Sequence, residues 1–92
     1  VIQMKLLDQE YKLIKDNGEC FDLELVKEKI TDYFKDYDYI VGDIAYSKLR
    51  LKGFTKKDNK MNNEINDFDR LDKYILENCA YGCKYFILEK IN

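Results

Sequence analysis

The stretch YDYIVGDIAYSKLRLKGF, from Tyr37 to Phe54, decides the fold of this chain. Residues 38–43 are a run of aromatic and β-branched side chains closed by Gly42-Asp43. Residues 45–54 then alternate, most clearly where the basic Lys48, Arg50 and Lys52 are separated by Leu49 and Leu51. Both patterns are typical of β-strands. Because the connection is short, we expect two antiparallel neighbours, with Gly42-Asp43 shaping the turn and Asp43 bonding backbone N–H groups.

Upstream of this stretch, the pattern predicts two more strands and a helix. Short apolar runs at residues 4–7 and 11–15 surround the polar residues 8–10, as in two strands joined by a turn. A turn cluster follows at residues 16–19, and Asp22 is a suitable N-cap. An amphipathic helix is predicted over residues 23–36 from apolar side chains at helical spacing, namely Val26, Ile30, Tyr33, Phe34 and Tyr37.

Downstream, a polar segment precedes a second helix and a last strand. We expect residues 55–64 to form a mobile loop and Asn66 or Asp67 to cap the helix. The helix would bury the stripe Phe68, Leu71, Tyr74, Ile75 and Cys79, and end at Gly82. Residues 85–91 are apolar on both faces, which favours a central strand. The order ββαββαβ predicts a single α+β domain over residues 1–92: one mixed sheet of about five strands with two helices packed on it.

The composition limits the possible functions. The chain has 92 residues and no His, Pro or Trp. The missing His removes the commonest general base and metal ligand, and no glycine-rich phosphate loop is present, so we expect no enzyme activity and no cofactor. No apolar run reaches the ~20 residues that span a bilayer, the start does not resemble a signal peptide, and three Cys do not suit a disulfide-stapled fold. We therefore expect a cytoplasmic protein without membrane contact.

A basic stripe is the leading candidate site. Residues two apart in a strand share a face, so one face of the strand over residues 45–54 would carry Tyr46, Lys48, Arg50, Lys52 and Phe54. Residues 44–60 hold six basic and one acidic side chain (net +5), whereas residues 16–43 hold three basic and nine acidic ones (net −6). Cations for phosphates and rings for base stacking suit RNA or DNA. The predicted nucleic-acid site is Tyr46, Lys48, Arg50, Lys52, Phe54, Lys56 and Lys57.

The same charge pattern is also compatible with two roles that involve no nucleic acid. An antiparallel sheet often keeps one polar face in water, and Lys on an edge strand prevents aggregation, so the stripe needs no ligand. The acidic segment and the many Tyr residues instead favour a protein-interaction module that docks through its acidic helix or a sheet edge.

The cysteines and acidic residues are weaker candidates for a site. Cys20, Cys79 and Cys83 could supply three thiolates to zinc, but the C-x₃-C spacing is not characteristic and buried Cys usually serves packing. Asp36, Asp38 and Asp43 flank the strand that begins near Tyr39. In a strand, Asp38 and Asp43 would point to opposite faces, which disfavours a shared Mg²⁺ site. We therefore expect no metal and no catalytic residues.

Three segments resemble the YutD-like family. They are Tyr37–Asp43 with Tyr46, Leu49–Phe54 and Cys79–Leu88, and the resemblance extends from residue 17 onward. The chain departs from the family pattern at Ile44 and Ala45, where members often have Trp and Gly. The resemblance implies a small cytosolic protein of low-G+C Gram-positive bacteria with a loose transcription-regulator label and no catalytic residues. A nucleic-acid-binding or transcription-regulatory module is thus the leading hypothesis, and a protein–protein interaction module is the alternative.

Overall fold

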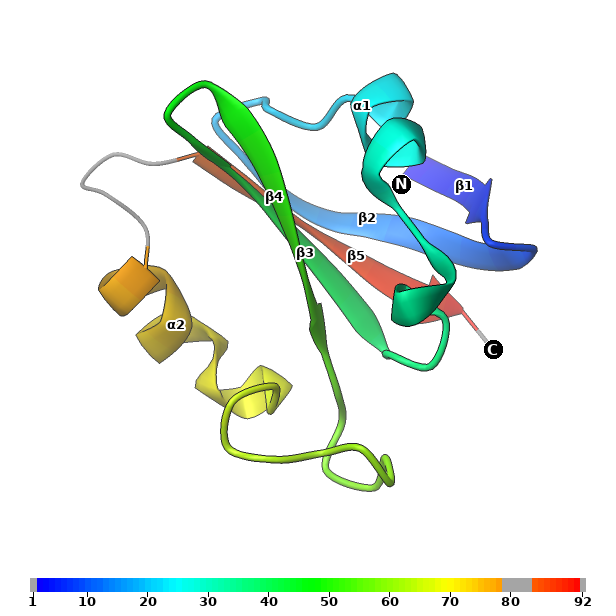
Figure 1. Ribbon diagram of the computed structural model, residues 1–92, viewed down its shortest axis with the longest axis vertical. Helices are drawn as coiled ribbons and strands as arrows, with labels where there is room; N and C mark the ends of the chain where they lie inside the picture. Colours follow the sequence, from blue (N-terminus) through cyan, green and yellow to red (C-terminus); the bar gives the residue numbers. More distant parts are fainter. Residues whose placement is uncertain (1, 79–83, 92) are drawn as a thin grey trace.

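A five-stranded antiparallel sheet organises the molecule (Figure 1). The computed structural model describes residues 2–78 and 84–91. The strands pair in the order β1-β2-β5-β3-β4. The elements are β1 (Ile2–Leu6), β2 (Gln9–Asn17), α1 (Leu23–Lys29), β3 (Tyr39–Ala45), β4 (Lys48–Phe54), α2 (Leu71–Asn78) and β5 (Lys84–Ile91), with two 3₁₀ turns, η1 (Asp32–Phe34) and η2 (Phe68–Arg70).

The α+β class, the element order and the central last strand are confirmed, but the prediction of a mixed sheet is wrong. Strand β5 lies between β2 and β3 and is antiparallel to both. Strands β2 and β3 run in the same direction, yet they do not pair because β5 separates them. All four pairs of neighbouring strands are therefore antiparallel.

Both hairpins turn on two residues that are neither Gly nor Asn. Leu7-Asp8 joins β1 to β2, and Tyr46-Ser47 joins β3 to β4, with φ of 54°, 60°, 53° and 63° in chain order. Two-residue hairpin turns require positive φ, which Gly and Asn adopt most readily. The prediction of a turn at Gly42-Asp43 is thus wrong. These residues lie inside β3, where Asp43 is opposite Arg50.

Helix α1 is shorter than predicted. Asp22 caps it as expected, because its carboxylate accepts hydrogen bonds from the N–H groups of Glu24 and Leu25. The helix ends at Lys29, since Ile30 and Thr31 adopt extended backbone angles before η1 begins. This break brings Phe34 against the sheet and leaves Tyr33 in solvent. In residues 2–78 and 84–91, neither helix has the length and apolar character required to cross a membrane.

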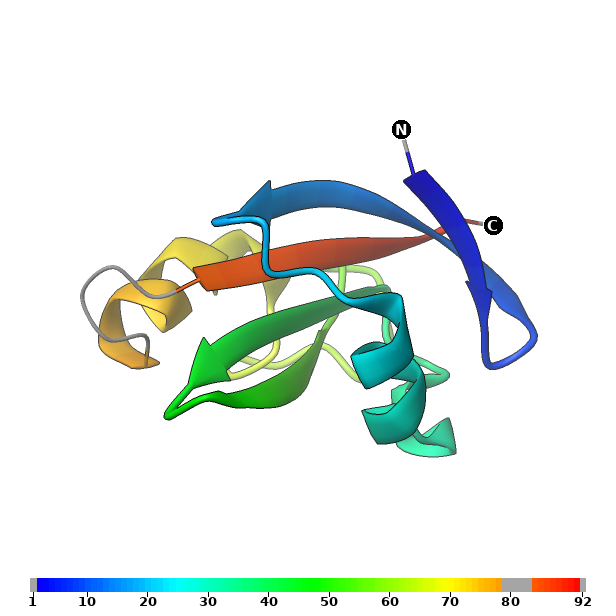
Figure 2. The same cartoon turned by 90° about the horizontal axis from the view of Figure 1, so that it is seen from above.

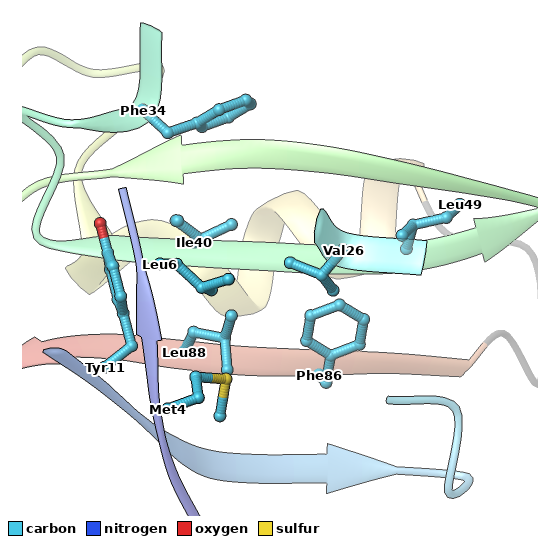
Figure 3. Packing of buried hydrophobic residues seen from close by; sticks show 9 residues of the cluster. All are labelled: Met4, Leu6, Tyr11, Val26, Phe34, Ile40, Leu49, Phe86 and Leu88. Atoms are coloured by element: carbon cyan, nitrogen blue, oxygen red, sulfur yellow. The ribbon is translucent and has the colours of Figure 1, made fainter. Parts of the chain in front are cut away.

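Each face of the sheet carries its own hydrophobic cluster. Figure 2 shows the sheet and its helices from above, and Figure 3 shows the first of the two clusters. The α1 face is formed around Met4, Leu6, Tyr11, Val26, Phe34, Ile40, Leu49, Phe86 and Leu88. The α2 face is formed around Tyr39, Val41, Phe54, Leu71 and Ile87, with Phe68, Tyr74 and Ile75 packed on them. Successive residues of β3, β4 and β5 point to opposite faces. The two helices therefore cover opposite sides of the sheet.

The segment between β4 and α2 is held by side-chain hydrogen bonds, in contrast to the expected mobile loop. The Asn59 amide donates to the Asp36 carbonyl and to the Asp38 carboxylate. The Asn66 carboxamide oxygen accepts from the Thr55 hydroxyl at 2.8 Å, and Thr55 and Asn66 are both buried. Asp67 caps η2 through the Asp69 N–H, as one of the two predicted caps. Asn and Asp side chains thus replace regular secondary structure here.

Gly42 is required by the close approach of β5. A Cβ atom at this position would lie 2.1 Å from the Phe86 ring, closer than two carbon atoms can approach. The fully buried Phe86 ring therefore lies directly across the backbone of β3.

We expect Gly42→Ala to destabilise the fold by about 2 kcal/mol, because Phe86 must leave its packed position. Urea denaturation measures the loss. The double variant Gly42→Ala, Phe86→Leu should cost less than the sum of the two single variants, since the smaller side chain removes the clash. Additive effects would contradict a clash between these two residues.

Candidate functional site

The predicted basic face of β4 exists, and it is the face covered in part by α2. Lys48, Arg50, Lys52 and Phe54 alternate with Leu49 and Leu51, which belong to the α1 face. Tyr46 is not on this strand face but in the hairpin turn, where it is 98% exposed. The stripe is therefore shorter than the sequence predicts and has no ring at its Lys48 end.

Arg50 is engaged by a buried carboxylate. Its Nε and Nη2 atoms donate to the two oxygens of Asp43 at 2.8 and 2.9 Å. Asp43 is buried on β3, directly across from Arg50 in the strand register. Such bidentate pairs are stronger than single charged hydrogen bonds, and removing one partner leaves the buried charge uncompensated. Arg50 thus stabilises the hairpin, while its side chain remains about half exposed.

Lys52 and Phe54 form part of the packing between β4 and α2. The Lys52 ammonium lies 5.4 Å from the Phe54 ring centre and 5.5 Å from the Tyr74 ring centre. Phe54 is fully buried and contacts Phe68 and Tyr74 edge to face. Its ring is therefore not accessible to a nucleic-acid base. A cation over two aromatic rings is a stabilising arrangement in itself.

The two predicted lysines beyond the strand differ in their surroundings. Lys57 forms an ion pair with the buried Asp67, whereas the Lys56 side chain is exposed and its backbone N–H donates to Asp38. The hydrogen bond from Lys57, aided by the Asp69 N–H, lowers the pKa of the Asp67 carboxyl below its usual value. Asp43 and Asp67 are partners of the cations that the sequence pattern did not predict. A turn at Tyr46-Ser47 places Asp43 opposite Arg50, so the correct turn would have identified Asp43 as the partner. Because the sequence pattern predicted the turn at Gly42-Asp43, this pair was missed.

A hollow of about 210 Å³ lies along the outer side of β4. Strand residues Leu51, Lys52 and Gly53 form one wall. The other lining residues are Tyr33, Tyr37, Asn63, Ile65 and Asn66. Tyr33 and Ile65 are 67% and 74% exposed, so each presents an apolar surface to solvent here. The hollow therefore combines an edge strand with exposed apolar surface.

The two tyrosines in this hollow are ordered by one another. The Tyr37 hydroxyl donates to the Tyr33 hydroxyl at 3.0 Å, and their ring centres are 5.4 Å apart. This hydrogen bond, with burial, raises the pKa of Tyr37 to about 12, so its hydroxyl remains protonated at neutral pH. Tyr37 also packs against Gly53, where an added Cβ would lie 2.4 Å from the ring.

A second hollow, of about 270 Å³, lies beside α2. Its lining comprises Glu64, Ile65, Arg70, Lys73, Tyr74 and Glu77. Ile65 lines both hollows, and Tyr74 is one of the rings beneath the Lys52 ammonium. The charges in this second hollow balance, because two basic side chains face two acidic ones.

The acidic and cysteine residues named as weaker candidates make contacts that stabilise the fold, where the structure describes them. Asp38 accepts hydrogen bonds from Lys56 and Asn59, and Asp43 binds Arg50. Cys20 is half-buried, and burial raises the pKa of its thiol. Cys79 and Cys83, which the zinc alternative needs, lie outside the described residues. Within the described ranges, no three Cys or carboxylate side chains are grouped closely enough to hold a metal ion.

These features define a small α+β protein whose antiparallel sheet has a basic edge strand. The chain belongs to the YutD-like family: it matches the family described as "Putative antitoxin YutD-like" over residues 5–89. It is 40% identical to "Putative antitoxin YutD" of Bacillus subtilis (strain 168) over 82 residues. These aligned residues cover 89% of this chain and 90% of that protein. It also resembles the solution NMR structure of protein yutD from B. subtilis, with a TM-score of 0.82 and 37% identity over all of this chain and 84% of that chain.

The resemblance to the YutD-like family is thereby confirmed. The descriptions of the family and of its B. subtilis member name an antitoxin and do not mention transcription or nucleic acid. They assign no residue to a function.

We expect the pKa of the Asp67 carboxyl to lie below 3.8 and to rise toward that value in Lys57→Met. Because the pKa is lower in the folded state, Asp67 contributes stability above about pH 4, and that contribution disappears as the pH falls through the folded pKa. An NMR titration of the carboxyl carbon measures both values. Lys56→Met is the matched control, and an equal shift in that variant would contradict the assigned ion pair.

Proposed function

We propose that this protein is a non-enzymatic binding protein that acts by docking on another protein through the β4 edge. The observation that carries this proposal is the exposed apolar surface beside that edge, at Tyr33 and Ile65. Large exposed apolar patches rimmed by polar side chains mark protein contacts. The family name supports the same conclusion, because an antitoxin that neutralises a protein toxin by contact must bind it.

The surroundings of the acidic side chains support a binding role over an enzymatic one. Asp43 and Asp67 are the buried carboxylates among the described residues, and each is neutralised by a cation. A general acid or base needs a carboxyl that is within reach of substrate and free to exchange its proton. The carboxylates here instead hold β3 to β4 and anchor the β4–α2 connection.

Nucleic-acid binding remains the second candidate, with one observation in its favour. Tyr46 and Lys48 at the hairpin tip are exposed, and so is the Lys56 side chain. They could contact a phosphate backbone and one base. Burial of Phe54 and the pairing of Arg50 and Lys57 weigh against a continuous stacking platform. A transcription-regulatory role would depend on this second candidate.

The first test is capture of a partner protein from nuclease-treated lysate of the source organism. We expect Ile65→Gln to reduce recovery of the specific partner about five-fold, as for the loss of a contact of about 1 kcal/mol. Leu76→Gln is the matched control, because Leu76 is also a large exposed apolar side chain (83%) but lines neither hollow. Equal recovery with both variants would contradict docking at this edge.

A direct binding measurement separates the two candidates. We expect no affinity for single-stranded RNA or DNA at ~50 mM salt, where phosphate contacts are strong. Binding that is lost when Lys48, Arg50 and Lys52 are all changed to Ala would instead establish the second candidate. Circular dichroism of the triple variant checks that the hairpin remains folded without the Asp43–Arg50 pair.

A further inference from the structure

The outer edge of β4 carries backbone groups that point away from β3 in a defined pattern. The two-residue turn makes Ala45 and Lys48 a hydrogen-bonded pair, so every second residue from Lys48 bonds inward to β3. The N–H and C=O groups of Leu49, Leu51 and Gly53 therefore point away from the sheet. In residues 2–78 and 84–91, β4 pairs with β3 and with no other strand. Among the described residues no backbone group pairs with these three outward positions, although Leu49 and Gly53 are themselves buried and Leu51 is half-buried.

The chain itself shows that this edge accepts backbone pairing. Thr55 is the next outward-pointing position after Gly53. Its N–H donates to the Asn66 carbonyl at 2.7 Å, and its carbonyl accepts from the Phe68 N–H at 2.9 Å. These bonds form a parallel bridge between Thr55 and Asp67. The chain then turns into η2, so the backbone pairing does not continue along Leu49–Gly53. The bridge occupies the position of a sixth strand but is one residue long.

The surroundings of the edge differ on its two faces. On the α1 face, an added strand would lie beside Leu49 and Leu51 and above the hollow that Tyr33 and Tyr37 line. On the α2 face it would lie beside Lys48, Arg50 and Lys52. Side chains directly across two strands are about 5 Å apart, so opposite charges stabilise the pair and like charges destabilise it. The second hollow is balanced in charge and Asp43 neutralises Arg50, so Lys48 and Lys52 give this face its net positive charge.

We propose that the partner binds by adding an extended segment to the outer edge of β4, with acidic side chains on the α2 face and apolar side chains on the α1 face. This rests on the proposed function and specifies the partner's chemistry. Alternate side chains of a strand point to opposite faces, so a segment of alternating acidic and apolar residues matches both at once. Its backbone would pair with Leu49, Leu51 and Gly53, and its apolar side chains would cover Tyr33 and Ile65.

The test uses a capped peptide of alternating glutamate and valine, added at about 1 mM so that even a weak contact is populated. Hydrogen exchange of the Leu49, Leu51 and Gly53 amides should slow about five-fold, since each would gain a hydrogen-bond acceptor. A lysine–valine peptide and a peptide of the same composition without alternation are the controls. Slowing by all three peptides, or by none, would overturn the proposal.

Two further arms identify the contact as strand pairing. Backbone N-methylation of the glutamates or of the valines blocks opposite edges of the peptide, so one set should abolish the effect and the other should not. Equal effects of the two sets would exclude edge pairing. Lys48→Glu should weaken the glutamate–valine peptide, whereas Lys5→Glu, an exposed lysine on the opposite edge strand β1, should not.

Failure of this inference is distinguishable from failure of the proposed function. If a partner is captured in an Ile65-dependent manner but the amides of Leu49, Leu51 and Gly53 exchange at the same rate in the complex, docking stands and strand addition is wrong. If no partner depends on Ile65, the proposed function itself is wrong. Slowed exchange at those three amides within the captured complex would establish both.

Discussion

The pairing of β5 with both β2 and β3 is the contact on which the rest of the structure depends. It joins the two ends of the chain to its middle, and it places Phe86 and Leu88 in one cluster and Ile87 in the other. Because β5 pairs with β3, the hairpin attaches to the sheet through β3, and β4 becomes an edge strand. The position of the candidate surface is thus a consequence of the last strand.

The charges on β4 serve the fold and the surface together. Arg50 neutralises Asp43, and Lys52 covers the rings of Phe54 and Tyr74, so neither cation is merely solvated. The same side chains keep a charged row at an unpaired edge, which discourages indiscriminate pairing with other chains. An edge protected in this way is selective, because an acidic segment is attracted to the basic row and a basic segment is repelled by it. Protection against aggregation and recognition of an acidic segment are therefore compatible uses of one row.

Much of the fold followed from local patterns, and the errors have identifiable physical causes. Alternation in β4, the Asp22 cap and the apolar β5 were recognisable because they depend on neighbours in the sequence. The length of α1 and the turn at Tyr46-Ser47 were not, because packing of Phe34 and the register of β3 override local propensity. For the candidate site, the cations were found, but their partners and the burial of Phe54 were not. The Asp43 partner depends on the β3–β4 register, the Asp67 partner on the path of the β4–α2 connection, and the burial of Phe54 on contacts with Phe68 and Tyr74.

By itself, the sequence determined the class of fold, the family and the alternation that puts three cations on one side of β4. Period-2 and helical spacing are local properties, and a chain carries them before it folds. Only the tertiary structure decided that β4 lies at the edge, that Asp43 and Asp67 bind Arg50 and Lys57, and that Tyr33 and Ile65 border a hollow beside it. Each of these depends on the register and order of strands far apart in the chain, which local spacing does not encode.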